Sequence, residues 1–147
     1  MKRLAKAALI AATATISVGA APVPGGDISV TVTDFRSMKG QVFACLARET
    51  DPFPQCNRGD GVRQLVLPTQ KADHFTFRNV PAGRYAIALL HDENANRKMD
   101  KVLMLPKEGF GFSRDAKVRM GPPSFSDAAF KVDEGGTDQS IRMRYMM

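Results

Sequence analysis

The sequence contains few of the residues that mark a catalytic protein. It has only two histidines and two cysteines among 147 residues, and the Gly-x-Ser-x-Gly pattern of serine hydrolases is absent. Its basic residues are scattered, without the clustering and interleaved aromatic residues of a nucleic-acid surface. The sequence therefore specifies no substrate or reaction, and it argues against nucleic-acid binding.

A hydrophobic run long enough to cross a bilayer is also missing. The apolar run 7–18 is shorter than the roughly 18 residues of a membrane span, and small residues follow it up to Ala20. Three basic residues precede it: Lys2, Arg3 and Lys6. This arrangement is typical of a secretory signal peptide, although a retained membrane anchor is the alternative. We expect a signal peptide over 1–20, a single domain over 21–147, a periplasmic or secreted location and no membrane span after cleavage.

Removal of the signal peptide changes the charge of the chain. Half of the formal charge of +6 leaves with its three basic residues, so the mature chain keeps a charge of +3. The apparent basicity is therefore mostly a targeting signal.

The two cysteines, Cys45 and Cys56, flank a loop that is rich in Asp and Pro. In an oxidising compartment this spacing favours a disulfide, which would stabilise the fold by about 3 kcal/mol in the chain-entropy model. The spacing is far from Cys-x-x-Cys, the pattern of a redox dithiol. We predict a structural Cys45–Cys56 bridge, with a pair of free buried thiols as the alternative.

Alternating apolar and polar residues predict about seven short strands. The predicted strands are 28–33, 41–46, 65–67, 74–80, 85–90, 128–132 and 140–145. Strand 85–90 is apolar on both faces, which predicts a central strand. The stretch 92–124 has no sustained periodicity, yet its leucines and phenylalanines indicate packing, so we expect one long ordered loop. The pattern favours an all-β protein, an antiparallel β-sandwich of the prealbumin or immunoglobulin kind.

Oxygen-bearing side chains recur at alternate positions after the central strand. The candidate metal ligands are Asp92, Asn94, Asn96, Lys98 through its carbonyl, Asp100 and Glu108. The spacing fits a calcium loop, because calcium takes six to eight oxygen ligands from alternate residues of a coiled loop. An EF-hand loop has glycine and glutamate where this chain has Arg97 and Leu103, so we expect weak binding. Glu93 is an alternative to Glu108, and a turn that caps its own backbone is the alternative to a metal site.

The two histidines are the remaining candidates for chemistry. His91 precedes Asp92, but adjacent strand residues point to opposite faces, which predicts a hydrogen-bonded strand-end histidine. His74 has no evident partner in the sequence. Phe110 and Phe112 either line a ligand groove or plug the end of the sandwich. Ser113 is interpreted as a loop serine and not as a nucleophile.

Four segments resemble motifs of one bacterial family. They are Val-Pro-Ala-Gly-Arg-Tyr-Ala at 80–86, His-Asp-Glu-Asn at 91–94, Pro-Lys-Glu-Gly-Phe-Gly-Phe-Ser at 106–113 and Pro-Pro-Ser-Phe at 122–125. In this order they resemble the secreted family called domain of unknown function 2141. The resemblance implies a small prealbumin-like β-sandwich of the envelope, with no known activity. Members of that family carry glycines where this chain has Ala95 and Arg97.

Two classes of function follow from these observations. The first is a secreted binding or structural module whose partner is an unknown protein or envelope ligand, with the loop 92–113 as an ion-stabilised contact surface. The second is a small prealbumin-like hydrolase that uses His74 and His91. The resemblance to 5-hydroxyisourate hydrolase fails at the C-terminus, because that family ends in Tyr-Arg-Gly-Ser and this chain ends Arg-Tyr-Met-Met at 144–147. The hydrolase hypothesis requires the two histidines to approach each other across an open pocket.

Overall fold

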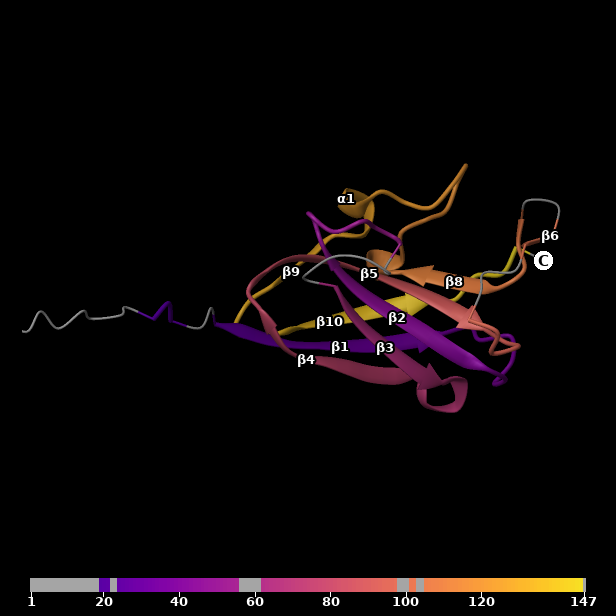
Figure 1. Cartoon of the computed structure of the whole chain (residues 1–147), viewed down its shortest axis with the longest axis horizontal. Helices are drawn as coiled ribbons and strands as arrows, with labels where there is room; N and C mark the ends of the chain where they lie inside the picture. The colour runs from indigo at the N-terminus through magenta and orange to yellow at the C-terminus, as the bar shows by residue number, and fades with distance from the viewer. Residues whose placement is uncertain (1–18, 22–23, 56–61, 98–100, 103–104, 147) are drawn as a thin grey trace, which may run out of the picture.

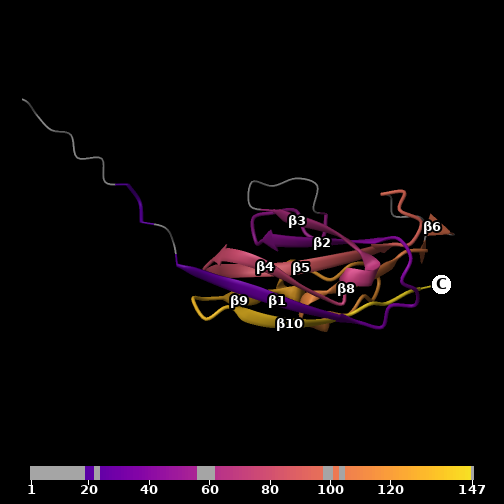
Figure 2. The ribbon, with the colours of Figure 1, turned by 90° about the horizontal axis from the view of Figure 1, so that it is seen from below.

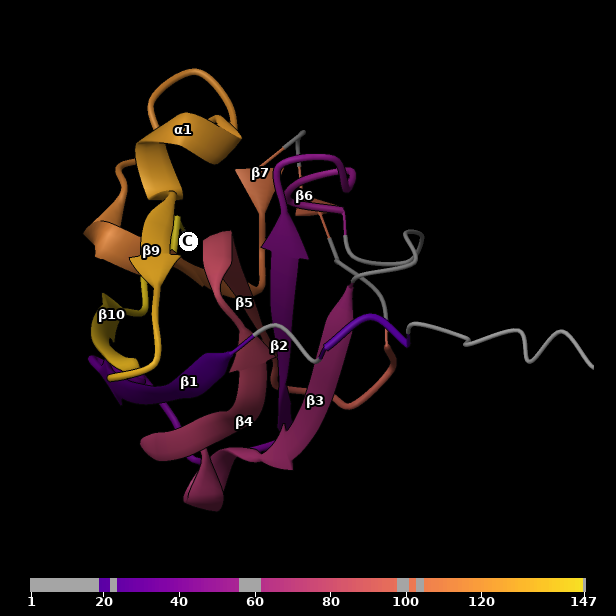
Figure 3. The same ribbon diagram turned by 90° about the vertical axis from the view of Figure 1, so that its left-hand side faces the viewer.

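Two sheets pack face to face in the computed structural model, which describes residues 19–21, 24–55, 62–97, 101–102 and 105–146 (Figures 1 and 3). The three-stranded sheet has the order β10 (Thr137–Arg142), β1 (Gly25–Thr33), β4 (His74–Pro81). The five-stranded sheet has the order β3 (Arg63–Pro68), β2 (Gln41–Arg48), β5 (Gly83–Asp92), β8 (Gly109–Phe112), with β9 (Phe130–Val132) also beside β5. The predicted all-β sandwich is therefore confirmed.

Short elements complete the fold. A small hairpin joins β6 (Lys101–Val102) to β7 (Leu105–Pro106). The helical turns are η1 (Thr69–Lys71), η2 (Ser113–Asp115) and α1 (Phe125–Ala128). Within the described ranges, no helix has the length and apolar character needed to cross a bilayer.

One strand pair departs from the antiparallel pattern. β10 runs parallel to β1, from Ile28 opposite Thr137 to Thr33 opposite Arg142, while the other pairs are antiparallel. Side-chain alternation is the same in both directions, so the sequence pattern does not encode this orientation.

The apolar faces of β5 explain its central place. Tyr85, Ile87 and Leu89 point into the core between the sheets, and Ala86 and Ala88 belong to a second apolar cluster on the opposite face. This two-sided burial confirms the predicted central strand, because a strand covered on both faces has no polar alternation.

The second apolar cluster also explains the two candidate groove residues. Phe110 and Phe112 are buried in it, and Phe53 packs edge-on against both Phe112 and Phe125. The segment from η2 to α1 lies against the same face of the five-stranded sheet (Figure 3). Phe110 and Phe112 are therefore packed inside the fold, as the alternative of a plug at the end of the sandwich predicts.

The expected long loop over 92–124 contains more regular structure than the sequence pattern predicted. The stretch includes β6, β7, β8 and η2. Gly109 and Gly111 lie within β8, and side chains of the C-terminal segment occupy the space beside them. A Cβ at Gly111 would collide with Ile141, and one at Gly109 would collide with the ring of Tyr145.

The C-terminal segment fastens the two sheets together. The amide of Met143 donates to the carbonyl of Thr33 at 2.9 Å, and Arg144 exchanges two backbone hydrogen bonds with Phe110 in β8. Figure 2 shows this segment running on from β10 toward the end of the molecule where β6 lies. The last residues of the chain are thereby brought beside the end of β5.

Two predictions about the first half of the chain fall partly outside the described residues. The predicted signal peptide lies almost entirely in 1–18. Cys45 is buried on the outer face of β2 and no free cysteine occurs among the described residues, but Cys56 lies outside them. The Cys45–Cys56 bridge therefore stays a prediction.

Candidate functional site

A network of polar side chains occupies the end of β5, where the His-Asp-Glu-Asn segment leaves the sheet. We call it the β5-end network, and its members are Arg36, Ser37, Lys39, Gln41, Thr69, His91, Asp92, Glu93, Glu108 and Tyr145. They come from the β1–β2 connection, the start of β2, η1, the end of β5, the start of β8 and the C-terminus. The network therefore gathers segments that are far apart in the sequence.

His91 is fully buried at the centre of this network. Its Nε2 lies 2.8 Å from the carbonyl oxygen of Lys39, which can only accept, so Nε2 carries the proton and donates. Its Nδ1 lies 2.7 Å from the hydroxyl of Tyr145. A neutral ring of this tautomer accepts the tyrosine proton at Nδ1, and both ring nitrogens are then satisfied. The prediction of a hydrogen-bonded strand-end histidine is confirmed.

Tyr145 sits in a socket formed by several elements. The guanidinium of Arg36 lies 4.5 Å from the ring centroid, within cation–π range, and the absence of a Cβ at Gly109 makes room for the ring. Burial raises the pKa of the Tyr145 hydroxyl above its ordinary value, so the hydroxyl keeps its proton for His91.

Glu93 connects the β1–β2 connection to the start of β8. Its carboxylate accepts hydrogen bonds from Nε of Arg36 at 3.0 Å and from the hydroxyl of Ser37 at 2.7 Å. The Arg36 hydrogen bond is the main cause that lowers the pKa of Glu93 from 4.5 to about 2. The backbone amide of Glu93 donates to the buried carboxylate of Glu108 at 3.2 Å. Glu93 thus connects the two segments through hydrogen bonds, and its carboxylate is ionised.

The loop after β5 coils around the carboxylate of Asp92. Oδ1 accepts from the amide of Asn96 at 3.2 Å, and Oδ2 accepts from the amide of Arg97 at 2.7 Å and from the side chain of Gln41 at 3.1 Å. Ala95 and Arg97 both adopt left-handed backbone angles, with φ of 55° and 61°. Such angles cost a non-glycine residue about 1–2 kcal/mol each, so the hydrogen bonds to Asp92 hold this coil against local strain.

The comparison with known proteins covers most of the folded chain. Residues 30–140 match the family model described as an uncharacterized protein conserved in bacteria, DUF2141. The chain belongs to the DUF2141 family. No curated protein and no solved structure matches it. The predicted family is confirmed, and the two positions where DUF2141 resemblance implies glycine are the two left-handed residues of the Asp92 loop.

The structure brings together part of the predicted calcium loop of this DUF2141 protein. Lys98 and Asp100 lie outside the described residues. The side-chain oxygen of Asn94 accepts from the amide of Asn96 at 3.1 Å, and Glu108 approaches the loop through the amide of Glu93. Where the structure describes the chain, no cluster of three or more Asp, Glu, His and Cys side chains could hold a metal. The hydrogen bonds resemble the predicted self-capping turn, and ion binding stays a prediction.

The two histidines do not form a common site. His74 points outward from the three-stranded sheet and is exposed, with Nδ1 at 3.4 Å from the hydroxyl of Thr31. His91 belongs to the five-stranded sheet and is buried between the layers. The hydrolase hypothesis required the two rings to approach each other, and this arrangement does not support it.

Ser113 has a structural place that the sequence did not reveal. Its hydroxyl is fully buried, accepts from the amide of Ile87 at 2.8 Å and donates to the carbonyl of Ala128 at 2.6 Å. It therefore joins β5 to α1 where β8 ends. These contacts agree with the interpretation that Ser113 is not a nucleophile.

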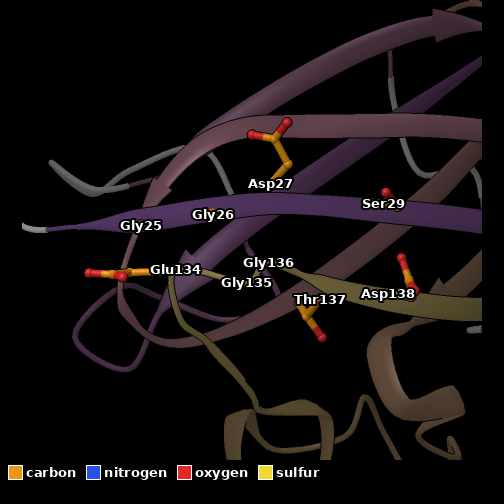
Figure 4. Close-up of a pocket in the computed structure, with 9 residues that line it drawn as sticks. All are labelled: Gly25, Gly26, Asp27, Ser29, Glu134, Gly135, Gly136, Thr137 and Asp138. Carbon is orange, nitrogen blue, oxygen red and sulfur yellow. The ribbon is translucent and has the colours of Figure 1, made fainter.

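A second polar region lies at the opposite end of β1. A hollow there is lined by Gly25, Gly26, Asp27, Ser29 and residues 134–138 (Figure 4). Figure 4 shows the carboxylates of Asp27 and Glu134 pointing in different directions. Asp27 already accepts a hydrogen bond from the amide of Asn79 at 2.9 Å. The carboxylates do not converge on one point, so the hollow does not form an ion site of the kind expected at Asp92.

Proposed function

We propose that this DUF2141 protein is an exported β-sandwich module that binds a partner or supports an assembly in the cell envelope. The observation that carries the proposal is the β5-end network, in which the chemically versatile residues of the family motifs are occupied by internal contacts. His91 and Asp92 are buried and hydrogen-bonded within the fold. Residues with such internal hydrogen bonds stabilise the surface that they support. Neither His91 nor Asp92 is then free to act as an acid, a base or a nucleophile.

We further propose that the Asp92 loop takes up calcium weakly. The support is that Asp92, Asn94 and Asn96 belong to one short coil, in which the amide of Asn96 donates to Asp92 and Asn94, and that the Glu108 carboxylate accepts from the amide of Glu93. Hard oxygen ligands of this type suit calcium, and a site with few carboxylates falls in the 10⁻⁴ to 10⁻³ M class of extracellular modules. Calcium would then stabilise the loop as a contact surface.

The test is thermal unfolding of the oxidised mature protein in EDTA, in millimolar calcium and in millimolar magnesium. If the calcium concentration is about fifty times the dissociation constant, linkage predicts a stabilisation of about 2.3 kcal/mol. The melting temperature should rise on the order of 5 to 10 °C with calcium only.

Variants separate ion binding from loop capping. Asp92→Ala should lower the melting temperature in EDTA, because two backbone amides lose their acceptor, and should also abolish the increment with calcium. Asp138→Asn, in the hollow at the opposite end of β1, should leave the rise in melting temperature with calcium unchanged. Equal melting temperatures of the wild-type protein in EDTA and calcium would show that the loop is a self-capping turn.

A further inference from the structure

The connection between η2 and α1 carries an unusually exposed apolar side chain. Met120 is fully exposed at the tip of this connection, and Gly121 and Pro122 beside it are exposed as well. Figures 1 and 3 show the connection projecting from the body of the sandwich as a narrow loop beside α1. We call residues 117–122 the Met120 loop.

The base of the Met120 loop is anchored, so the exposure of the tip is built into the fold. Ala116 and Val118 pack in the second apolar cluster, Pro123 is buried, and Phe125 contacts the same cluster. The side chains that alternate with these anchors therefore point outward. The apolar side chain of Met120 is therefore exposed to water on an anchored loop. Contact with another apolar surface would bury it and lower the free energy.

Two basic residues precede the exposed methionine in the Met120 loop. Lys117 lies three residues before it and Arg119 directly before it, and both are exposed. Arg114 and Arg119 also lie close enough to Asp127 to act on its carboxylate, whose pKa is lowered mainly by hydrogen bonds within the Ser124 cap of α1. The loop thus combines an exposed apolar side chain with two exposed basic side chains.

We propose that the Met120 loop docks the protein on an anionic bilayer surface, with Met120 entering among the headgroups and with Lys117 and Arg119 contacting lipid phosphates. This goes beyond the proposed function and does not depend on the Asp92 loop. A single apolar side chain on a convex tip suits a soft bilayer interface better than a protein partner, which would need a matching pocket. Interfacial segments commonly combine apolar insertion with basic residues in this way.

The absence of tryptophan from the chain allows a direct test. Met120→Trp introduces a single tryptophan at the tip, and its fluorescence is followed as vesicles are added to the mature protein in EDTA. Vesicles of phosphatidylglycerol and phosphatidylethanolamine should shift the emission to shorter wavelength, and the shift should be lost in high salt. Phosphatidylcholine vesicles should give no shift. EDTA removes any calcium effect, so this result is independent of the Asp92 loop.

Matched variants locate the contact. Met38→Trp reports on another exposed methionine, in the β1–β2 connection, and should show no shift with the same vesicles. Co-sedimentation of the tryptophan-free protein with anionic vesicles should weaken about five-fold for each of Lys117→Gln and Arg119→Gln, which corresponds to about 1 kcal/mol per basic residue near an anionic surface. Failure to bind anionic vesicles, or equal shifts at positions 38 and 120, would overturn the proposal.

Discussion

The ring of His91 and the hydroxyl of Tyr145 meet at 2.7 Å, which joins the central strand to the end of the chain. Because Nε2 of His91 donates to the carbonyl of Lys39, the same ring also holds the β1–β2 connection. The contact with Tyr145 therefore links three segments that the sequence places far apart. Removal of this hydrogen bond should lower the free energy of unfolding more than removal of a hydrogen bond from an exposed residue.

Tyr145→Phe should lower the free energy of unfolding by about 1–3 kcal/mol. The change keeps the ring in its socket but leaves the buried Nδ1 of His91 without a donor, and an unsatisfied buried polar atom costs free energy of this size. The measurement is urea unfolding at neutral pH.

Tyr85→Phe is the matched control. Tyr85 is buried, whereas Tyr145 is partly buried, and the Tyr85 hydroxyl donates to the carbonyl of Pro81 at 2.9 Å. Because Pro81 is exposed, water can replace the lost donor. We expect a loss of about 1 kcal/mol or less. Equal losses in the two variants would contradict the special place of the His91–Tyr145 contact.

The strands were predictable from the sequence because their signal is local. The continuous apolar run in 85–90 and the paired phenylalanines in 74–80 reflect burial directly, and the structure buries Phe75, Phe77 and both faces of β5. β8 was not predicted, because it lies in the stretch 92–124, where no periodicity is sustained. Its glycines make sense only once Ile141 and Tyr145, some thirty residues later, are placed beside them.

The candidate site was predictable only in part. The His-Asp-Glu-Asn segment located it, because polar residues after a core strand must lie at the edge of a sheet. The partners Arg36, Gln41 and Tyr145 come from other elements, and no local spacing relates them to β5. Tertiary packing alone determines those pairs. The left-handed angles at Ala95 and Arg97 accompany local hydrogen bonds to Asp92, which residue spacing does not reveal.

Ala95→Gly and Arg97→Gly should each stabilise the protein by about 0.5–1 kcal/mol. Both residues adopt left-handed backbone angles that glycine takes without a steric cost, and part of this gain is offset by the greater entropy of glycine in the unfolded chain. The measurement is the urea midpoint of each single variant and of the double variant.

Ala82→Gly provides the comparison for these substitutions. Ala82 is an exposed alanine in the turn between β4 and β5, and it is not among the residues with positive φ. Glycine there should destabilise the protein by about 0.5–1 kcal/mol, because only the entropic effect remains. A loss of stability in the Ala95 and Arg97 variants would show that their side chains contribute contacts that outweigh the backbone strain.

Glu93 should make the stability of the protein depend on acid pH. Its pKa is about 2 in the folded protein and has an ordinary value of 4.5, so folding favours the ionised form. The contribution is fully present above pH 4.5 and is lost as the pH falls from 4.5 toward 2, because the unfolded chain binds the proton first. Glu93→Gln should cost about 1 kcal/mol at pH 7, where the Arg36 pair is broken, and should approach the wild-type stability near pH 2. Urea unfolding across this range measures the difference between the two proteins.

Glu49→Gln, which breaks the exposed pair of Glu49 with Arg84, is the control and should follow the wild-type profile. A Glu93→Gln difference that stays constant from pH 7 to pH 2 would mean that the carboxylate charge does not stabilise the β5-end network, and that Glu93 acts through its shape and neutral hydrogen bonds.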